Sequence, residues 1–146
     1  MPANRFDPLL KHAETCEEKA ARQYAEKLKA LSDNEQRLHE LARYAAEYAA
    51  PDRGASTAAL LVNRQRFRER VQSALDQQKT IVERSRANAD LERARLLLAS
   101  RDSKALEQLA ASHRVRAARA AGKREQTSLD DLAARQHRSR RERNDP

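Results

Sequence analysis

The stretch LARYAAEYAAPDRGAS, residues 41–56, decides the fold. It is an alanine-rich run with two tyrosines that ends at Pro51, which cannot continue a helix interior, and Gly54 follows to relieve backbone strain. Ser56, the last residue of the stretch, or Thr57, directly after it, can cap a new helix with its hydroxyl. We therefore predict one helix before a turn at 51–56 and a second helix after it. A connection this short usually sends the second helix back antiparallel to the first.

The composition of the whole chain favours long solvated helices over a globular core. Of 146 residues, 36% are charged, only 3% are aromatic and only two are glycine. The dominant residues, Ala, Leu, Arg, Glu, Lys and Gln, are the best helix formers, and this bias is typical of coiled coils. Disorder is the alternative for so polar a chain, but the apolar periodicity argues against it.

The segment before the turn predicts a helix over about residues 7–50, with Asp7 as its N-cap and Pro8 at its first position. A seven-residue repeat runs through it, as the contact seam of a coiled coil requires. One series of the repeat is Leu10, Glu17, Tyr24, Leu31, Leu38 and Ala45, and the other is Phe6, Ala13, Ala20, Lys27, Asn34, Leu41 and Tyr48.

The segment after the turn predicts a longer helix over about 57–138, with irregularities near 88, at 100–103 and at 122–128, and a frayed tail at 139–146. Its apolar stripe comprises Leu60, Phe67, Val71, Ala74, Leu75, Gln78, Ile81, Val82 and Ser85. The pattern then slips in phase and resumes as Leu91, Ala94, Leu98, Leu106 and Leu109. We thus expect an all-α fold, with residues 1–146 forming a single antiparallel two-helix coiled coil.

The unequal helix lengths predict how the two helices face each other. With the turn centred near Gly54, residue 48 lies opposite about 60, Phe67 opposite about 41 and Phe6 opposite about 102, because both helices rise equally. The chain beyond about 105 then has no partner inside the hairpin, and its leucines need another chain or stay loosely ordered. These leucines are Leu106, Leu109, Leu129 and Leu132.

The scarce rings gather near the closed end of this predicted hairpin. They are joined there by apolar neighbours, and the cluster is Leu41, Tyr44, Tyr48, Phe67, Val71 and Ala74. Tyr48 and Phe67 either seal the end of the hairpin or contact a partner. Tyr44 flanks the repeat, which favours a surface role, since exposed tyrosine is enriched at interfaces.

Catalytic and metal-binding motifs are missing from the sequence. There is no nucleophile elbow, phosphate-binding glycine loop, HExxH motif or cysteine pair, and the four histidines are dispersed. We expect a protein without enzyme activity, metal or cofactor. No stretch approaches the ~18 apolar residues of a membrane span, and the first residues lack the apolar core of a signal peptide. These features predict a cytosolic protein.

Four motifs, in this order and spacing, resemble the flagellar FliJ family, the small coiled-coil component of the flagellar type III protein export apparatus. They are RFDPLL at 5–10, LARYAAEYA at 41–49, FRERVQSALDQQ at 67–78 and KREQTSLDDLA at 123–133. The resemblance covers nearly the whole chain. It implies an antiparallel two-helix coiled coil similar to the central stalk of rotary ATPases.

The resemblance also implies partners and a location. The partners are the hexameric flagellar export ATPase, the cytoplasmic linker of the large export-gate membrane protein and flagellar export chaperones, with no nucleic acid. The implied protein is a monomer when free and lies in the cytoplasm, peripherally associated with the inner face of the cell membrane. The family's gate-binding surface corresponds to Leu41, Tyr44, Tyr48, Phe67, Val71, Ala74 and Gln78. Position along the chain assigns the ATPase contact to Phe6, Leu10, Arg124, Gln126, Leu129 and Asp130.

Two other function classes remain open at this point. The arginine-rich region 114–143 is compatible with a nucleic-acid-binding coiled coil, which would bind phosphates with a steep salt dependence. A generic self-associating coiled coil is the third reading, which sedimentation of the free protein distinguishes from a monomer with exposed binding surfaces.

Overall fold

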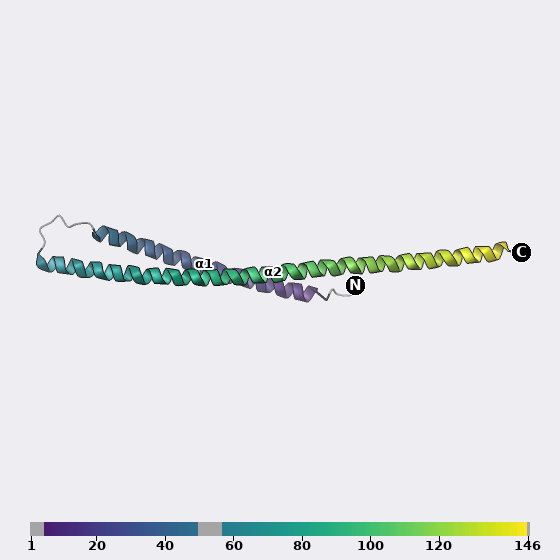
Figure 1. The fold of residues 1–146 in the computed structure, drawn as a ribbon, viewed down its shortest axis with the longest axis horizontal. Helices are drawn as coiled ribbons and strands as arrows, with labels where there is room; N and C mark the ends of the chain where they lie inside the picture. The colour runs from purple at the N-terminus through teal and green to yellow at the C-terminus, as the bar shows by residue number, and fades with distance from the viewer. Residues whose placement is uncertain (1–4, 50–56, 146) are drawn as a thin grey trace. The chain divides into compact units, whose positions relative to one another are not determined.

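The computed structural model describes residues 5–49 and 57–145, and over these ranges the chain folds into two helices. Helix α1 spans Asp7–Ala49 and helix α2 spans Ala58–Asn144, with no strand in the described part of the chain. The prediction of an all-α hairpin with a longer second helix is confirmed (Figure 1). The predicted turn at 51–56 lies outside the described residues.

The two helices begin at different kinds of cap. The Leu60 amide donates to the Thr57 hydroxyl at 3.3 Å, and the Leu61 amide donates to the Thr57 carbonyl at 3.1 Å, so Thr57 is the N-cap of α2. At α1 the first helical bond runs from the Leu10 amide to the Phe6 carbonyl at 2.8 Å. Asp7 therefore lies in the first turn, where its charge favours the helix dipole, and the prediction of Asp7 as N-cap is wrong.

The chain divides into two compact units, each built from parts of both helices. The central unit comprises Glu14–Arg101, and the terminal unit comprises Met1–Ala13 and Asp102–Pro146. In the central unit the helices are antiparallel, because Ser85 bonds to Asn34 while Ser100, farther along α2, bonds to Glu17, nearer the start of α1.

The surface of α2 that contacts α1, called the seam here, keeps one phase along the helix. Its positions alternate in steps of three and four residues, and each is buried or half-buried: Val71, Leu75, Gln78, Val82, Ser85, Ala89, Glu92, Leu96 and Ala99 in the central unit, then Ser103, Leu106 and Ala110 in the terminal unit. The predicted phase slip is therefore wrong. Leu91 and Leu98, taken as seam residues, are 51% and 59% exposed, because Ala89 and Glu92 occupy the seam in their place.

The seam of α1 follows the predicted seven-residue repeat more closely. Buried or half-buried positions are Phe6, Leu10, Ala13, Glu17, Ala20, Tyr24, Leu31, Asn34, Leu38, Leu41 and Ala45. Lys27 and Tyr48 are exceptions, since both are exposed. Alanines are the most buried apolar residues of α1, so the helices meet through small side chains at these positions.

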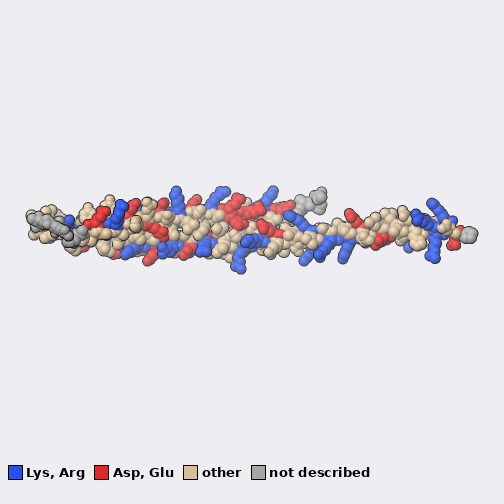
Figure 2. All heavy atoms as spheres, turned by 90° about the horizontal axis from the view of Figure 1, so that it is seen from above, with Lys and Arg blue, Asp and Glu red and all other residues tan. Residues whose placement is uncertain are grey.

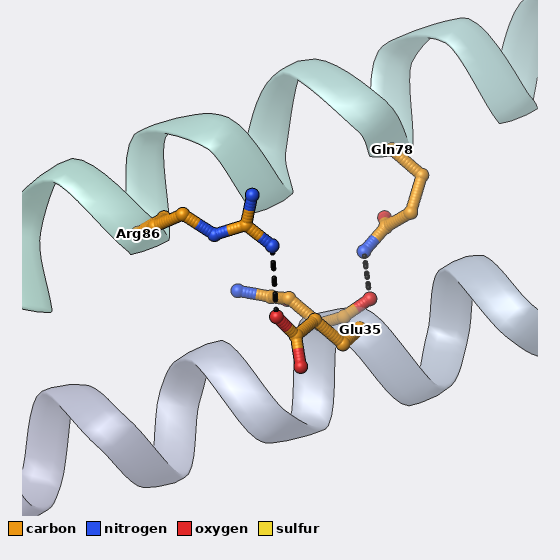
Figure 3. A network of polar contacts seen from close by, with 4 residues as sticks. Glu35, Gln78 and Arg86 are labelled. Carbon is orange, nitrogen blue, oxygen red and sulfur yellow. Dashed lines mark hydrogen bonds and ion pairs between the residues drawn. The ribbon is translucent and has the colours of Figure 1, made fainter.

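Polar contacts cross the seam of the central unit. The Gln78 amide donates to the Asn34 carbonyl at 3.0 Å, and the Asn34 amide donates to the Ser85 hydroxyl at 2.7 Å. Beside them Arg86 pairs with Glu35 at 3.2 Å, and Figure 3 shows Gln78 and Arg86 of α2 pointing toward α1. Polar residues at a coiled-coil seam specify register at some cost in stability, so these contacts define which residues face each other.

The observed register differs from the predicted one. Tyr48 packs against Phe67 with ring centroids 4.6 Å apart, and in the terminal unit Phe6 packs against His113 at 5.3 Å. Both partners on α2 lie well beyond the predicted residues 60 and 102. The reason is that the first turns of α2 precede the contact with α1, which leaves Leu60, for example, 56% exposed.

Helix α2 is longer and more regular than predicted. It runs without interruption from Ala58 to Asn144, through the positions near 88, at 100–103 and at 122–128 where irregularities were expected. The segment expected to fray from residue 139 is helical to Asn144. Arginine and glutamate are good helix formers, and Arg141 and Arg143 in the last turn complement the negative end of the helix dipole.

Candidate functional site

The residues predicted to bind the export gate all lie in the central unit, where the structure sorts them by exposure. The three rings are exposed: Tyr44 at 52%, Phe67 at 42% and Tyr48 at 39%. Leu41, Val71 and Ala74 are half-buried in or beside the seam. Gln78 is only 9% exposed, and its amide is engaged by the Asn34 carbonyl, so it belongs to the seam.

A groove of about 330 Å³ is lined by residues of both helices and shows which side of α1 lies next to which side of α2. From each helix it collects residues on one flank of the seam: Ala49, which follows Tyr48 of α1, with Gln65 and Gln72, which follow the half-buried Arg64 and Val71 of α2. Tyr44 directly precedes the seam residue Ala45, and Phe67 directly precedes the half-buried Arg68, so the two rings share the opposite side of the helix pair. This second side is the candidate gate-binding surface.

Two further apolar residues extend that side. Leu60 and Ile81 lie seven residues before Phe67 and seven residues after Ala74, which places them on the same flank of α2. They are 56% and 42% exposed. The apolar pattern predicts both in the core stripe, whereas their seven-residue spacing from Phe67 and Ala74 is the signal that separates them from it. We call Tyr44, Leu60, Phe67, Ala74 and Ile81 the ring face.

An interaction between the helices holds the ring face near the end of α1. The Arg68 guanidinium donates to the Tyr48 carbonyl at 2.9 Å. The last carbonyls of a helix have no partner within it, and α1 has no basic residue in its own last turn. Arg68 therefore caps α1 from the neighbouring helix, and the adjacent Phe67 is held against the Tyr48 ring.

The residues predicted to bind the ATPase lie in the terminal unit, in two groups. Phe6 and Leu10 are half-buried against α2, where Phe6 meets the His113 ring and the Arg5 guanidinium lies 5.6 Å from the Phe6 ring centroid. The other group is exposed on α2 and comprises Arg124, Gln126, Leu129 and Asp130. Gln126 donates to Asp130 at 3.2 Å. The structure does not bring the groups together, since residue 124 lies about 16 Å along the helix from His113.

The charged side chains of the described residues form no metal centre. Figure 2 shows basic and acidic side chains interspersed along both helices, with a group of Lys and Arg near the end of α2. Among the described residues there is no group of three or more His, Cys, Asp or Glu side chains that could hold a metal ion. Neither α1 nor α2, over its described length, has a stretch apolar enough to cross a membrane.

Comparison with known protein families shows to which family the chain belongs. Residues 2–142 match the family model described as flagellar FliJ protein. The chain belongs to the FliJ family. The resemblance predicted from the four sequence motifs is thereby confirmed. No curated protein and no solved structure matches the chain. Membership of the FliJ family implies a role in flagellar protein export and association with the export apparatus, and FliJ is a family of structural export components rather than of enzymes.

Proposed function

We propose that this FliJ family member couples the export ATPase ring to the membrane export gate and helps to recycle export chaperones. It acts as a cytoplasmic monomer that associates peripherally with the inner face of the cell membrane through the export apparatus. The observation that carries this proposal is the exposure of two separate sets of apolar residues, the ring face in the central unit and the last part of α2 in the terminal unit.

The ring face supports a contact with the linker of the export gate. Tyr44 and Phe67 each leave about half of their surface to solvent. Aromatic side chains of this kind are enriched among the few residues that carry most of the binding energy of an interface. Ala74, between Phe67 and Ile81, is the smallest side chain of the ring face.

The last part of α2 supports a contact with the ATPase ring. Leu129 is 61% exposed and Leu132 is 54% exposed. Arg124 lines a shallow pocket together with Leu129, and Asp130 is the next residue of the helix, so opposite charges are offered near Leu129. All described side chains from residue 111 onward are exposed, so residues 124–132 are open to a partner.

A reciprocal binding experiment tests both assignments. The double variant Tyr44→Ala with Phe67→Ala should bind the purified gate linker about tenfold or more weakly, while its affinity for the export ATPase stays unchanged. The double variant Arg124→Ala with Leu129→Ala should show the opposite pattern. Leu91→Ala with Leu98→Ala, which removes equally exposed side chains elsewhere on α2, is the matched control.

Circular dichroism accompanies each binding measurement. If the Tyr44 and Phe67 variant loses helicity along with gate binding, the rings serve packing and the assignment of the ring face fails. If the control variant loses gate binding to the same degree, apolar surface in general, and not the ring face, attracts the linker. Unchanged ATPase binding by the Arg124 and Leu129 variant contradicts the second assignment.

A further inference from the structure

Beyond its contact with α1, helix α2 carries a second apolar stripe. Its members follow one another in steps of three and four residues, with Glu125 as the single charged position among them: Ala111, Val115, Ala118, Gly122, Leu129 and Leu132. We call this set the C-terminal stripe. Every member is exposed, and Val115 leaves 51% of its surface to solvent. Such spacing is the pattern by which a helix packs along another helix.

The C-terminal stripe is not a continuation of the seam. In the seam phase, Ala110 is followed by His113, Ala117 and Ala120. Ala120 lies two residues from both Ala118 and Gly122, which is about 200° around an α-helix. The stripe therefore points away from the side of α2 that meets Phe6 in the terminal unit. Contact with α1 leaves it uncovered.

Gly122 is a member of the C-terminal stripe whose residue type no contact in the described structure explains. Glycine within a helix destabilises it relative to alanine. A Cβ at Gly122 would meet nothing within 4 Å, so no neighbour in the described structure requires the missing side chain. Glycine permits close approach of another group to the backbone. Its place on the stripe, between Ala118 and Leu129, fits a helix that packs closely here.

The edges of the stripe are basic. Arg114 and Arg135 lie on one edge and Arg119 on the other, whereas no acidic residue occupies either edge. In coiled coils the residues that flank the apolar seam select the partner by charge. A second copy of this chain would bring arginine toward arginine, so acidic edges on the partner are favoured. Glu125 within the stripe adds a polar position that can specify register.

We propose that the C-terminal stripe is a docking surface for an amphipathic helix of another protein, whose apolar stripe is flanked by aspartate or glutamate. The partner helix packs along residues 111–132, about 33 Å of α2, and forms an intermolecular two-helix coiled coil with it. This inference goes beyond the proposed function, because it defines the chemistry of a partner segment and stands even if the export ATPase does not bind α2.

The test uses the full-length protein and a synthetic helical peptide of about four heptads with leucine at its seam positions and glutamate at its flanks. A peptide with the same leucines and lysine flanks is the control ligand. Titration calorimetry should show the glutamate peptide binding about tenfold or more tightly than the lysine peptide, with an affinity that falls as salt is raised.

A matched pair of variants separates the stripe from general attraction between opposite charges. Ala118→Glu should lower the affinity of the protein for the glutamate peptide about tenfold or more. Ala120→Glu makes the same charge change on the opposite side of α2 and should change that affinity less than about twofold. Both alanines are exposed, so both variants should keep the circular dichroism spectrum of the wild type.

Four results would overturn the proposal. The first is that the glutamate peptide fails to bind. The second is that the two variants lower its affinity equally, in which case the arginines attract the peptide without a packed stripe. The free protein could prove to be a dimer that Ala118→Glu dissociates, which would make a second copy the occupant. Finally, a short DNA duplex could displace the peptide, and Ala118→Glu could abolish binding of that duplex. That result would assign the surface to nucleic acid.

Discussion

Glu92 is a carboxylate in the seam, and replacing it with leucine tests the observed phase of α2. The residue is 7% exposed and lies between Ala89 and Leu96 along the seam. One carboxylate oxygen pairs with Arg95 at 2.9 Å, while the other, Oε2, is buried without a hydrogen-bond partner. A buried polar atom without a partner costs stability that an apolar side chain does not.

The expected gain combines two favourable and two unfavourable terms. Burying a leucine side chain contributes about 1.5–3 kcal/mol, and removing a buried unpaired oxygen adds about 1–3 kcal/mol. Losing the pair with Arg95, whose side chain is 58% exposed, costs about 0.2–0.5 kcal/mol. Fitting leucine beside the small residues of the seam costs about 1–3 kcal/mol. We therefore expect Glu92→Leu to raise the free energy of unfolding by about 2 kcal/mol, within the range measured when buried ion pairs are replaced by apolar residues.

Urea unfolding followed by the helical circular dichroism signal measures this change. The control is Glu83→Leu, the same substitution at an exposed position of the same helix, which should alter the free energy of unfolding by less than about 0.5 kcal/mol. The reasoning is refuted if Glu92→Leu is no more stable than Glu83→Leu. That result would mean that position 92 does not lie between the helices and that the predicted phase slip of α2 was correct.

The remaining predictions concern the cap of α1 and the close packing of the terminal unit. Arg68→Ala removes the hydrogen bond to the Tyr48 carbonyl and should lower the free energy of unfolding by about 1 kcal/mol in urea, whereas the exposed Arg70→Ala should not; equal effects would exclude the cap. Ser103 is only 3% exposed, and fitting a larger side chain into a packed position is costly, so Ser103→Leu should destabilise the protein by about 1–3 kcal/mol in a thermal melt. The exposed Ser128→Leu is its control, and an unchanged melting temperature for Ser103→Leu would show that the seam is open there.

Helix α1 shows how far the sequence could predict contacts. Its seven-residue repeat predicted the buried or half-buried positions from Phe6 to Ala45 except Gln23, and it wrongly included the exposed Lys27. The prediction succeeded because apolar and small residues recur at the same positions over the whole helix. Tyr48, the last position of the repeat, is exposed near the end of α1 at Ala49, although its ring packs against Phe67.

The seam of α2 was wrongly predicted, because the large apolar residues of this helix do not occupy its seam. Ile81, Leu91 and Leu98 drew the apolar pattern toward the exposed flank, while Ala89 and Glu92 are the buried residues. A search for apolar side chains cannot recognise a seam of alanine, serine and glutamate. For the same reason the ring face was only partly predicted, with Tyr44 and Phe67 identified and Ile81 assigned to the core.

The sequence by itself determined that the chain is helical, where α2 begins, that the two helices are unequal and antiparallel, and to which family the chain belongs. These features depend on helix propensity, on the Thr57 cap and on motifs that are local in the chain. Only the tertiary structure decided the register and the face of each helix that is free to bind a partner. The pairing of Tyr48 with Phe67, the Arg68 cap and the Asn34–Ser85 bond each join residues far apart in sequence, and no local pattern encodes such contacts.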